Sequence, residues 1–376
     1  MKVMQILPEL NAGGVEMCVL ELAQTLVEAG HTSLVVSNGG VMVAKLEMQG
    51  SRHIRLRVHR KSPVSLFRVW CLRRLLLQEK PQILHYHSRV PGWIAYLAWL
   101  SLRPSLRPRL VSTMHGFHSV SPYSAVMTKG ERVIAVSQSM RSYLLKNYPA
   151  TSPERIIVVY PGLDHHRYER HTLLASADAE ALEVAYPLPP GVWRLILPGR
   201  ITRLKGHHDF LWLLAALQRR GRAVQGLVVG SEHPRKKAYA QELSAAVDAL
   251  KLRGSVHFLG HRSDLPVLMA SSHMVLSLSQ QPESFGRTVL ESLALGTCIA
   301  GYAYGGVGEL LNCLYPQGRV LPKDRNDLLR VVEHLLSDPP AAPPLEGSFT
   351  LPQMLAGHLQ LYEQLVSGSL RISSLD

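Results

Sequence analysis

The hydrophobic residues in the first half of the chain follow two alternating spacings. Short apolar runs such as VMQILP (residues 3–8) predict buried strands. The apolar residues from Val15 to Leu26 instead recur on one stripe of a helix predicted over residues 15–29. The same criteria predict strands at 32–37, 82–87, 109–114, 132–136 and 156–160, and helices at 66–78, 92–102 and 138–147.

The second half resumes this alternation after an interruption. Residues 165–191 are rich in His, Ala and Pro and include PLPPG, so we expect an irregular linker there. Beyond it the pattern predicts strands at 193–198, 224–230, 255–259, 273–278 and 297–301, and helices at 206–219, 236–251, 264–270, 286–295, 307–312, 325–337 and 351–366.

The alternation of strands and helices indicates an α/β fold. Such repeats give parallel sheets with helices on both faces, and a chain of 376 residues suits two domains. We therefore expect two doubly wound, Rossmann-like domains facing each other across a cleft, over residues 1–170 and 190–340. Ligands of such sheets bind outside the carboxyl ends of the strands, where the strand order reverses.

The composition narrows the classes of partner and of compartment. The chain has 41 Lys+Arg against 28 Asp+Glu, a net charge of +13, and much of the excess lies in the first 110 residues. This favours a phosphorylated ligand, an anionic membrane surface or nucleic acid, although a solvated basic face is the alternative. No nucleic-acid-binding motif accompanies the charge, so we expect no nucleic-acid partner. The four cysteines lack CxxC spacing, which favours the cytoplasm over a disulfide framework or a zinc site.

Residues 66–78 predict a basic amphipathic helix. It could lie on an anionic membrane with Trp70 and Leu75 facing the lipid and its arginines facing outward. Ordinary packing against the sheet is the alternative, and the sequence favours it. No apolar run approaches the roughly 20 residues that span a bilayer, and the N-terminus reads as a first strand rather than a signal peptide.

The stretch GRITRLKGH (residues 199–207) follows a predicted strand. An arginine at the end of a strand and a lysine at the start of a helix can together clamp a diphosphate, because the guanidinium forms directed hydrogen bonds and the ammonium acts as a point charge. Arg200 and Lys205 occupy these positions, flanked by Gly199 and Gly206. The alternative is a basic loop without a ligand.

The stretch ESFGRTVLE (residues 283–291) holds two glutamates that bracket a helix start. Eight helical residues rise about 12 Å, so Glu283 and Glu291 should not meet at the roughly 5–9 Å of a glycosidase pair. The N–H groups between Phe285 and Thr288 would instead offer a phosphate site at the helix N-terminus. We expect one elongated ligand with a polar group at each glutamate and phosphates between them; ordinary surface glutamates are the alternative.

Two glycine-containing loops complete the candidates. NAGGVE (residues 11–16) lies between a strand and a helix, where backbone can approach an anion, although a tight turn is the alternative. TMHGF (residues 113–117) places His115 at the end of a strand. A lone histidine is more often structural, but this position favours contact with a ligand. The remaining histidines do not form a defensible metal-ligand set, and no metal site is expected.

These motifs together resemble a known family. GRITRLKGH, the E-x7-E stretch, GGVE at residues 13–16 and GGVGEL at residues 305–310 are similar to family 4 retaining glycosyltransferases of the GT-B fold, which include enzymes of lipopolysaccharide core and other bacterial glycan synthesis. The resemblance covers nearly the whole chain. It implies transfer of a sugar, with retention, from a nucleoside diphosphate sugar such as a UDP-sugar. The acceptor would be an anionic membrane glycolipid or polysaccharide, met at the inner face of the cytoplasmic membrane.

The resemblance also implies roles for individual residues. Arg200 and Lys205 would bind the diphosphate and stabilise the leaving group, Glu283 would hydrogen-bond sugar hydroxyls, and His115 would face the sugar near the reacting carbon. The donor-binding set would add Gly14 by the diphosphate, Arg262 beside the base, the backbone of Phe285, Gly286, Arg287 and Thr288, and Glu291 on the ribose. The final helix, within residues 351–376, would pack back on the first domain.

Two departures from the family pattern stand out. Pro161 replaces the usual Asn in PGLD (residues 161–164), so we expect a stiffer hinge, and Gly308 stands where Pro is common, which should loosen that helix start.

The motifs also suggest a mechanism. The chain shows no DxD-type acidic pair, so we expect cations rather than a required metal or other cofactor to stabilise the leaving group. Because no carboxylate is placed as a nucleophile, we expect departure and attack on one face of the sugar. A nucleotide-sugar epimerase that needs no lipid acceptor is the alternative.

Overall fold

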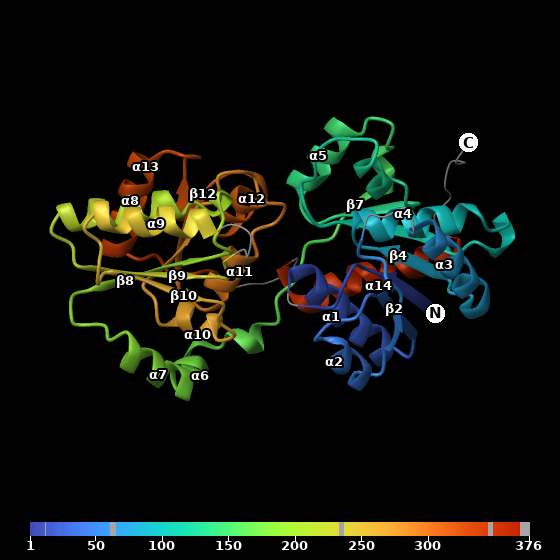
Figure 1. Cartoon of the computed structure of the whole chain (residues 1–376), viewed down its shortest axis with the longest axis horizontal. Coiled ribbons are helices and arrows are strands. Elements are labelled where there is room, and N and C mark those ends of the chain that lie inside the picture. The colour runs from blue at the N-terminus through green and yellow to red at the C-terminus, as the bar shows by residue number, and fades with distance from the viewer. Residues whose placement is uncertain (12, 61–64, 233–236, 345–348, 369–376) are drawn as a thin grey trace. The chain divides into compact units, whose positions relative to one another are not determined.

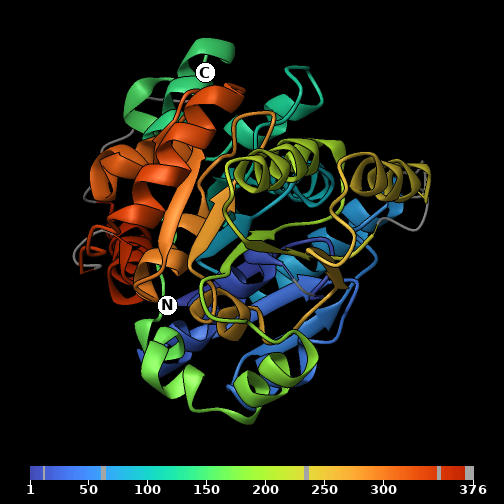
Figure 2. The same cartoon turned by 90° about the vertical axis from the view of Figure 1, so that its left-hand side faces the viewer.

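The computed structural model describes residues 1–11, 13–60, 65–232, 237–344 and 349–368. The chain divides into two compact units, drawn in Figure 1 and, after a quarter turn, in Figure 2. The first unit comprises Met1–Gly162 together with the C-terminal segment from Leu351, and the second comprises Leu163–Thr350. The division therefore falls at Gly162, inside PGLD, and residues 163–170 belong to the second unit rather than to the first domain where we expected them.

The first unit is built on a parallel sheet with strand order β3-β2-β1-β4-β5-β6-β7. Its buried apolar runs form strands whose ends lie close to the predicted ones. The short, charged edge strand β3 was not predicted. The strands are β1 (Lys2–Ile6), β2 (Thr32–Ser37), β3 (Arg52–Arg55), β4 (Ile83–Tyr86), β5 (Arg109–Met114), β6 (Arg132–Ala135) and β7 (Ile156–Val158).

Helices cover the first sheet, and the C-terminal helix is one of them. Its helices are α1 (Gly14–Glu28), α2 (Val43–Met48), α3 (Ser65–Glu79), α4 (Arg89–Leu100), α5 (Gln138–Asn147) and α14 (Leu351–Ser367). Leu22 and Leu26 of α1 share one buried cluster with Tyr362 of α14 and Ile83 of β4, and Figure 1 shows α1 and α14 side by side. Helix α14 ends at Ser367, and residues 369–376 of the predicted segment lie outside the described residues.

The second unit has a parallel sheet with strand order β10-β9-β8-β11-β12-β13. Its strands are β8 (Trp193–Pro198), β9 (Val224–Val229), β10 (Val256–Gly260), β11 (Met274–Ser277), β12 (Cys298–Tyr302) and the very short β13 (Arg319–Val320), which sequence patterns did not predict. Its helices are α6 (Arg170–Leu174), α7 (Ala177–Ala185), α8 (His207–Arg219), α9 (Lys237–Ala249), α10 (Leu265–Ala270), α11 (Arg287–Ala294), α12 (Gly305–Leu314) and α13 (Arg325–Ser337). In Figure 1, α8, α9 and α13 lie on one side of this sheet and α6, α7 and α10 on the other.

The expected linker over residues 165–191 was wrong, because this segment forms α6 and α7 and packs on α10. The reason lies in Arg194, which is fully buried in β8. Its guanidinium donates to Glu183 of α7 at 2.6 Å and to the carbonyl of Tyr186 at 2.5 Å. A buried guanidinium without partners is costly, so this segment folds onto the sheet.

Candidate active site

The strand order of the second unit reverses between β8 and β11. From β8 the chain adds β9 and β10 on one side and then returns to place β11, β12 and β13 on the other. The loops that follow β8 and β11 therefore leave the sheet at the position where doubly wound sheets bind ligands. GRITRLKGH forms the first of these loops, and the residues up to Gly286 form the second.

These two loops pack against each other through their backbones. The N–H of Gln280 donates to the carbonyl of Leu204 at 2.7 Å. Gly206 has φ 75°, and a Cβ there would lie 2.0 Å from the carbonyl oxygen of Leu278. Only glycine tolerates both the left-handed backbone and this approach, which explains why a glycine follows Lys205.

The loop contact brings Lys205 and Glu283 together. Lys205 Nζ lies 2.6 Å from Glu283 Oε1, and both side chains are partly buried. The Ser279 hydroxyl also donates to Glu283. Burial on its own would raise the pKa of Glu283, but the charge of Lys205 and the two hydrogen bonds outweigh it and lower that pKa. Glu283 is therefore a carboxylate at neutral pH.

Arg200 lies in the same loop as Lys205, five residues before it, but differs from it in its contacts. It is exposed and follows Gly199 at the end of β8. Among the described residues it has no hydrogen bond or ion pair, unlike Lys205. Its guanidinium can therefore meet an anion without first giving up a protein partner.

The second glutamate binds other groups. Glu291 Oε1 accepts from Arg287 Nε at 2.9 Å and from the Tyr168 hydroxyl at 3.0 Å. Burial, followed by the charge of Glu291, raises the pKa of Tyr168. Glu283 and Glu291 thus have separate sets of partners, Glu283 in the loop before α11 and Glu291 inside that helix.

The start of α11 presents backbone groups between them. No side chain caps this helix at Gly286, and Phe285 is buried beneath it. GGVGEL holds the loop in place, because Gly306 N donates to the Glu283 carbonyl at 2.7 Å and a Cβ on Gly306 would lie 2.1 Å from the Phe285 carbonyl oxygen. Helix α12 begins at Gly305, two residues earlier than predicted, so Gly308 lies inside it.

Arg262 follows β10, the edge strand. Its guanidinium forms a two-pronged pair with Asp264, at 2.8 Å from Nε and 2.5 Å from Nη2. The hydrogen bond from Arg262 lowers the pKa of Asp264 against the opposing effect of burial. The arginine is therefore held at the end of the strand.

The first unit holds the other two predicted residues, Gly14 and His115. Its strand order reverses between β1 and β4. Gly14 is the exposed first residue of α1, and a Cβ there would meet nothing within 4 Å. His115 follows β5 and hydrogen-bonds His87, with 3.0 Å between Nε2 and Nδ1. Burial, followed by the neighbouring His358 and His118, lowers the pKa of His115 to about 3.

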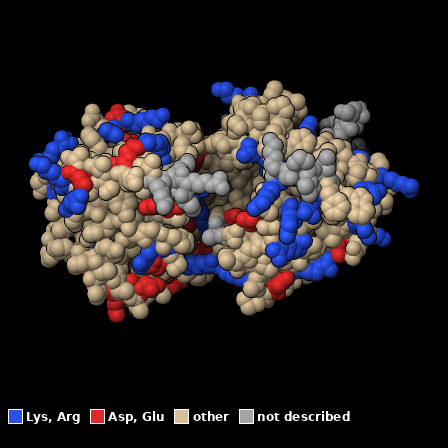
Figure 3. All heavy atoms as spheres, viewed as in Figure 1, with Lys and Arg blue, Asp and Glu red and all other residues tan. Residues whose placement is uncertain are grey.

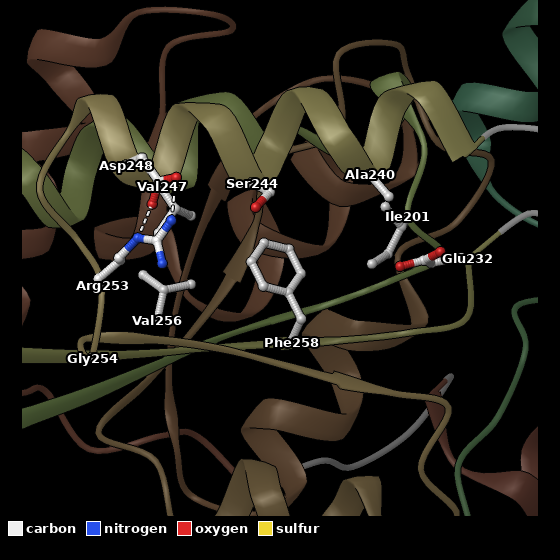
Figure 4. Close-up of a pocket in the computed structure, with 10 residues that line it drawn as sticks. All are labelled: Ile201, Glu232, Ala240, Ser244, Val247, Asp248, Arg253, Gly254, Val256 and Phe258. Carbon is white, nitrogen blue, oxygen red and sulfur yellow. Dashed lines mark hydrogen bonds and ion pairs between the residues drawn. The ribbon is translucent and has the colours of Figure 1, made fainter.

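The described residues contain no group of three His, Cys, Asp or Glu side chains that could hold a metal ion. A cavity of about 360 Å³ lies elsewhere in the second unit, between α9 and β10 (Figure 4). It contains none of the predicted site residues, although Ile201 is adjacent to Arg200. The charged loops at the strand reversal, and not this cavity, therefore form the candidate site.

Two family descriptions match the chain. Glycosyltransferase Family 4 matches residues 12–167, and Glycosyl transferases group 1 matches residues 178–345, so together they span most of the sequence. The chain belongs to the family 4 glycosyltransferases of the GT-B fold. It is therefore an enzyme that transfers a glycosyl group.

Known proteins similar to this glycosyltransferase include the α-maltose-1-phosphate synthase of Mycolicibacterium smegmatis, 29% identical over 305 residues, which are 70% of this chain and 72% of the relative. A solved glycosyltransferase from Rickettsia africae has a TM-score of 0.82 at 25% identity, over 97% of this chain and 99% of that one. Anabaena HepE, solved with UDP and glucose, has a TM-score of 0.74 at 19% identity, over 98% and 99%. The two doubly wound sheets agree with the GT-B fold of these structures.

Sequence reasoning missed several side chains of this glycosyltransferase that contact the predicted residues. Tyr168 was assigned to the linker, and Ser279 had no motif around it. His87 was visible in QILHYH at the end of a predicted strand, one strand from His115, but we considered it only as a metal ligand. Its position at a strand end was the signal that could have paired it with His115.

Proposed function

We propose that this glycosyltransferase moves a sugar, with retention, from a nucleoside diphosphate sugar, namely a UDP-sugar, to a membrane glycolipid or polysaccharide acceptor in lipopolysaccharide or other cell-surface glycan synthesis. The donor assignment rests on the Lys205–Glu283 ion pair at the strand reversal, in loops that also hold the exposed Arg200. The UDP complex of HepE, a protein of the same fold, supports the choice of nucleotide.

On donor binding, side chains that now contact each other would contact the donor instead. Lys205 would turn to the diphosphate and leave Glu283 to accept hydrogen bonds from sugar hydroxyls. Arg200 and the N–H groups at the α11 start, from Phe285 to Thr288, would take further phosphate oxygens. Glu291 would bind the ribose and Arg262 would border the base.

The same residues suggest how the sugar leaves. Two cations facing the diphosphate stabilise the charge that develops on the leaving group, so the proposal needs no divalent ion. Glu283 accepts a hydrogen bond from Ser279, and once Lys205 has turned to the diphosphate we assign Glu283 to sugar hydroxyls rather than to nucleophilic attack. A phosphate oxygen of the leaving group would then assist deprotonation of the acceptor on the same face of the sugar. Gly14 would lie by the diphosphate, and His115 would contact the donor sugar.

The first unit supports the proposal of a membrane-bound acceptor. Helix α3 buries Leu72 and Leu76 but exposes 56% of Phe67 and 49% of Trp70. Arg74 stacks over the Trp70 ring at 4.9 Å. Figure 3 shows many lysines and arginines on the visible face of this unit. Exposed aromatics beside arginines are suited to an anionic lipid surface, and no described helix is long and apolar enough to cross a membrane. We propose that the enzyme works at the inner face of the cytoplasmic membrane.

Transfer assays test the function. Radiolabelled UDP-sugars would be incubated with detergent-solubilised bacterial glycolipids, in the presence and absence of EDTA, and the anomeric configuration of the product would be read by NMR. We expect UDP release coupled to a glycosylated lipid of retained configuration, unaffected by EDTA. Epimerised nucleotide sugar formed without any acceptor would favour the epimerase alternative and contradict the proposal.

Vesicle flotation tests the membrane contact. The wild-type protein should float with vesicles that contain 30% anionic lipid, and Trp70→Ser should float less. Trp193→Phe, in β8, is the matched control because Trp193 lies in the other unit. Equal flotation of the Trp70 variant and the wild type would contradict a role for α3.

A further inference from the structure

A buried carboxylate lies in the first turn of α8, four residues after Lys205. This residue, Asp209, is 7% exposed and accepts hydrogen bonds from three side chains of other elements. Nε of Arg325 donates to its Oδ1 at 2.7 Å. The hydroxyl of Tyr302 and the amide nitrogen of Gln280 each donate to its Oδ2, also at 2.7 Å. A buried carboxylate needs such partners, so Asp209 and its donors hold one another in place.

Gln280 connects this buried carboxylate to the candidate site. It lies in the loop after β11, three residues before Glu283. Its amide nitrogen donates to Asp209 and, at 3.2 Å, to the carbonyl of Leu278. Turning the amide over would set its oxygen against these two acceptor oxygens. The side chain of Gln280 therefore has a single orientation.

The same glutamine is bonded to the loop that carries Lys205. The N–H of Gln280 donates to the carbonyl of Leu204 at 2.7 Å, and Leu204 directly precedes Lys205. The carbonyl of Leu278, which accepts from the amide of Gln280, is also the group against which Gly206 packs. Gln280 therefore fixes the backbone on both sides of Lys205.

The other member of the ion pair is held by the residue next to Gln280. The hydroxyl of the buried Ser279 donates to Glu283, and the carbonyl of Ser279 accepts from the hydroxyl of Tyr304. Because Ser279 and Gln280 are consecutive, a shift of Gln280 would move the contacts of both members of the pair. The 2.6 Å separation between the Lys205 ammonium and the Glu283 carboxylate therefore depends on Gln280.

We propose that Asp209 and Gln280 are positioning residues that hold Lys205 and Glu283 at ion-pair distance. The ammonium then lies in place for a phosphate before the donor binds, which reduces the cost of ordering it on binding. The effect of these two residues on ligand binding rests on the proposed function, whereas their effect on the ion pair does not.

Titration of Glu283 tests the positioning in the free protein. NMR would follow the carboxyl signals of ¹³C-glutamate-labelled protein against pH, and Glu283→Gln would identify the signal of Glu283. The charge of Lys205 and its hydrogen bond lower the pKa of Glu283 against the effect of burial, so moving the ammonium away should raise that pKa. In Gln280→Leu we expect a rise of about 1, at the lower end of what an adjacent opposite charge contributes.

Gln218→Leu is the matched control for this titration. Gln218 lies near the C-terminal end of α8, and its amide nitrogen donates to the hydroxyl of Ser255 at 2.9 Å. Its replacement removes a hydrogen bond of the same kind from the same unit and should leave the pKa of Glu283 unchanged. An unchanged pKa of Glu283 in Gln280→Leu, shown by circular dichroism to be folded, would overturn the proposal.

Calorimetric titration of UDP tests whether the positioning matters for binding. Gln280→Leu should weaken UDP binding about 2–10-fold, the equivalent of one typical hydrogen bond. The same change made in Lys205→Ala should add no further loss, because residues that act through one network are not additive. An equal further loss would overturn the route through Lys205. A wild type that binds no UDP would instead contradict the proposed function, and the titration of Glu283 would still decide the positioning.

Variants of Asp209 test the origin of the effect. Asp209→Ala should weaken UDP binding as Gln280→Leu does. Asp209→Asn keeps an oxygen for the amide of Gln280 and should recover most of the loss, although it removes the negative charge that pairs with Arg325. Recovery in Asp209→Asn would support the contact with Gln280, and an equal loss in both Asp209 variants would overturn it.

Discussion

The two units have the same kind of sheet, but the side chains at their strand ends have opposite character. In the second unit the ammonium of Lys205 and the carboxylate of Glu283 form an ion pair, the exposed Arg200 lies in the same loop as Lys205, and the pKa of Glu283 is lowered. In the first unit the corresponding residues are imidazoles whose pKa values are lowered by burial, so they are neutral at pH 7. The fold therefore does not determine the chemistry of the strand ends. We infer that the charged set binds phosphates and that the neutral set forms directed hydrogen bonds to hydroxyls.

Removing the ammonium should have the largest effect. Lys205→Ala should reduce kcat by about 10²–10³-fold, comparable to the loss of one donor that stabilises a developing negative charge. Steady-state transfer assays measure this effect. Arg330→Ala removes an exposed charge of the same unit and should leave kcat unchanged.

Circular dichroism must show that Lys205→Ala is folded, because Glu283 loses its partner in this variant. Lys205→Arg keeps the positive charge but changes the shape of the charged group. Its activity therefore shows whether the charge alone is sufficient for transfer. Near-normal transfer by a folded Lys205→Ala protein would contradict the claim that the charged side chains of the second unit act on the phosphates.

Replacing the glycine between the two charged loops should affect both activity and stability. Gly206→Ala adds a Cβ 2.0 Å from the Leu278 carbonyl oxygen at φ 75°, and we expect it to cost at least about 1–3 kcal/mol in the free energy of unfolding. Urea denaturation measures this cost. Gly221→Ala, also at positive φ but with nothing within 4 Å of the added Cβ, is the control for backbone strain alone. An equal cost for both variants would show that the loop contact is unimportant.

The neutral histidines should make the protein sensitive to mild acid. Since their folded pKa values lie below the unfolded value of about 6.5, their contribution to stability is complete above pH 6.5. It falls as the pH drops toward the folded values of about 3 for His115 and about 4 for His118. Each such histidine should contribute a slope of about 1.4 kcal/mol per pH unit over this window. His207 of the second unit, with a pKa lowered to about 4, should add to it.

Urea denaturation between pH 7 and pH 5 checks this expectation. His115→Gln should reduce the slope by roughly one proton, because one group no longer takes up a proton on unfolding. The exposed His334→Gln should not change it in the same way. A slope that His115→Gln leaves unaltered would indicate that His115 is charged in the folded protein.

Arg262 should have the smallest effect. Its pairing with Asp264 is partly exposed, and such contacts contribute about 0–1 kcal/mol. Arg262→Ala should therefore weaken UDP binding less than about fivefold, as measured by calorimetry. If Arg262→Ala lost as much UDP affinity as Lys205→Ala, contacts to the base rather than to the diphosphate would dominate UDP binding.

The sequence predicted the strands well where they are buried on both faces, because short continuous apolar runs such as RLILP are typical of buried strands. It also singled out Lys205 and Glu283, which the structure places 2.6 Å apart, since glycine and charge coincide at predicted strand ends. It failed for residues 165–191, where a high content of His and Pro masked two helices that fold onto the buried Arg194. It could not find the contacts of Tyr168 or His87, because these depend on which strands become neighbours rather than on local spacing.

Titration of UDP into three proteins by calorimetry tests the central claim most directly, that the charged loops of the second unit carry the diphosphate site. The account predicts that Lys205→Ala weakens UDP binding by at least about 10-fold, or 1.4 kcal/mol, because a charge-assisted contact to phosphate is lost. It predicts that His115→Gln binds UDP as the wild type does, since UDP carries no sugar in the position that His115 would contact. Unchanged binding by Lys205→Ala, or an equal loss in His115→Gln, would contradict it.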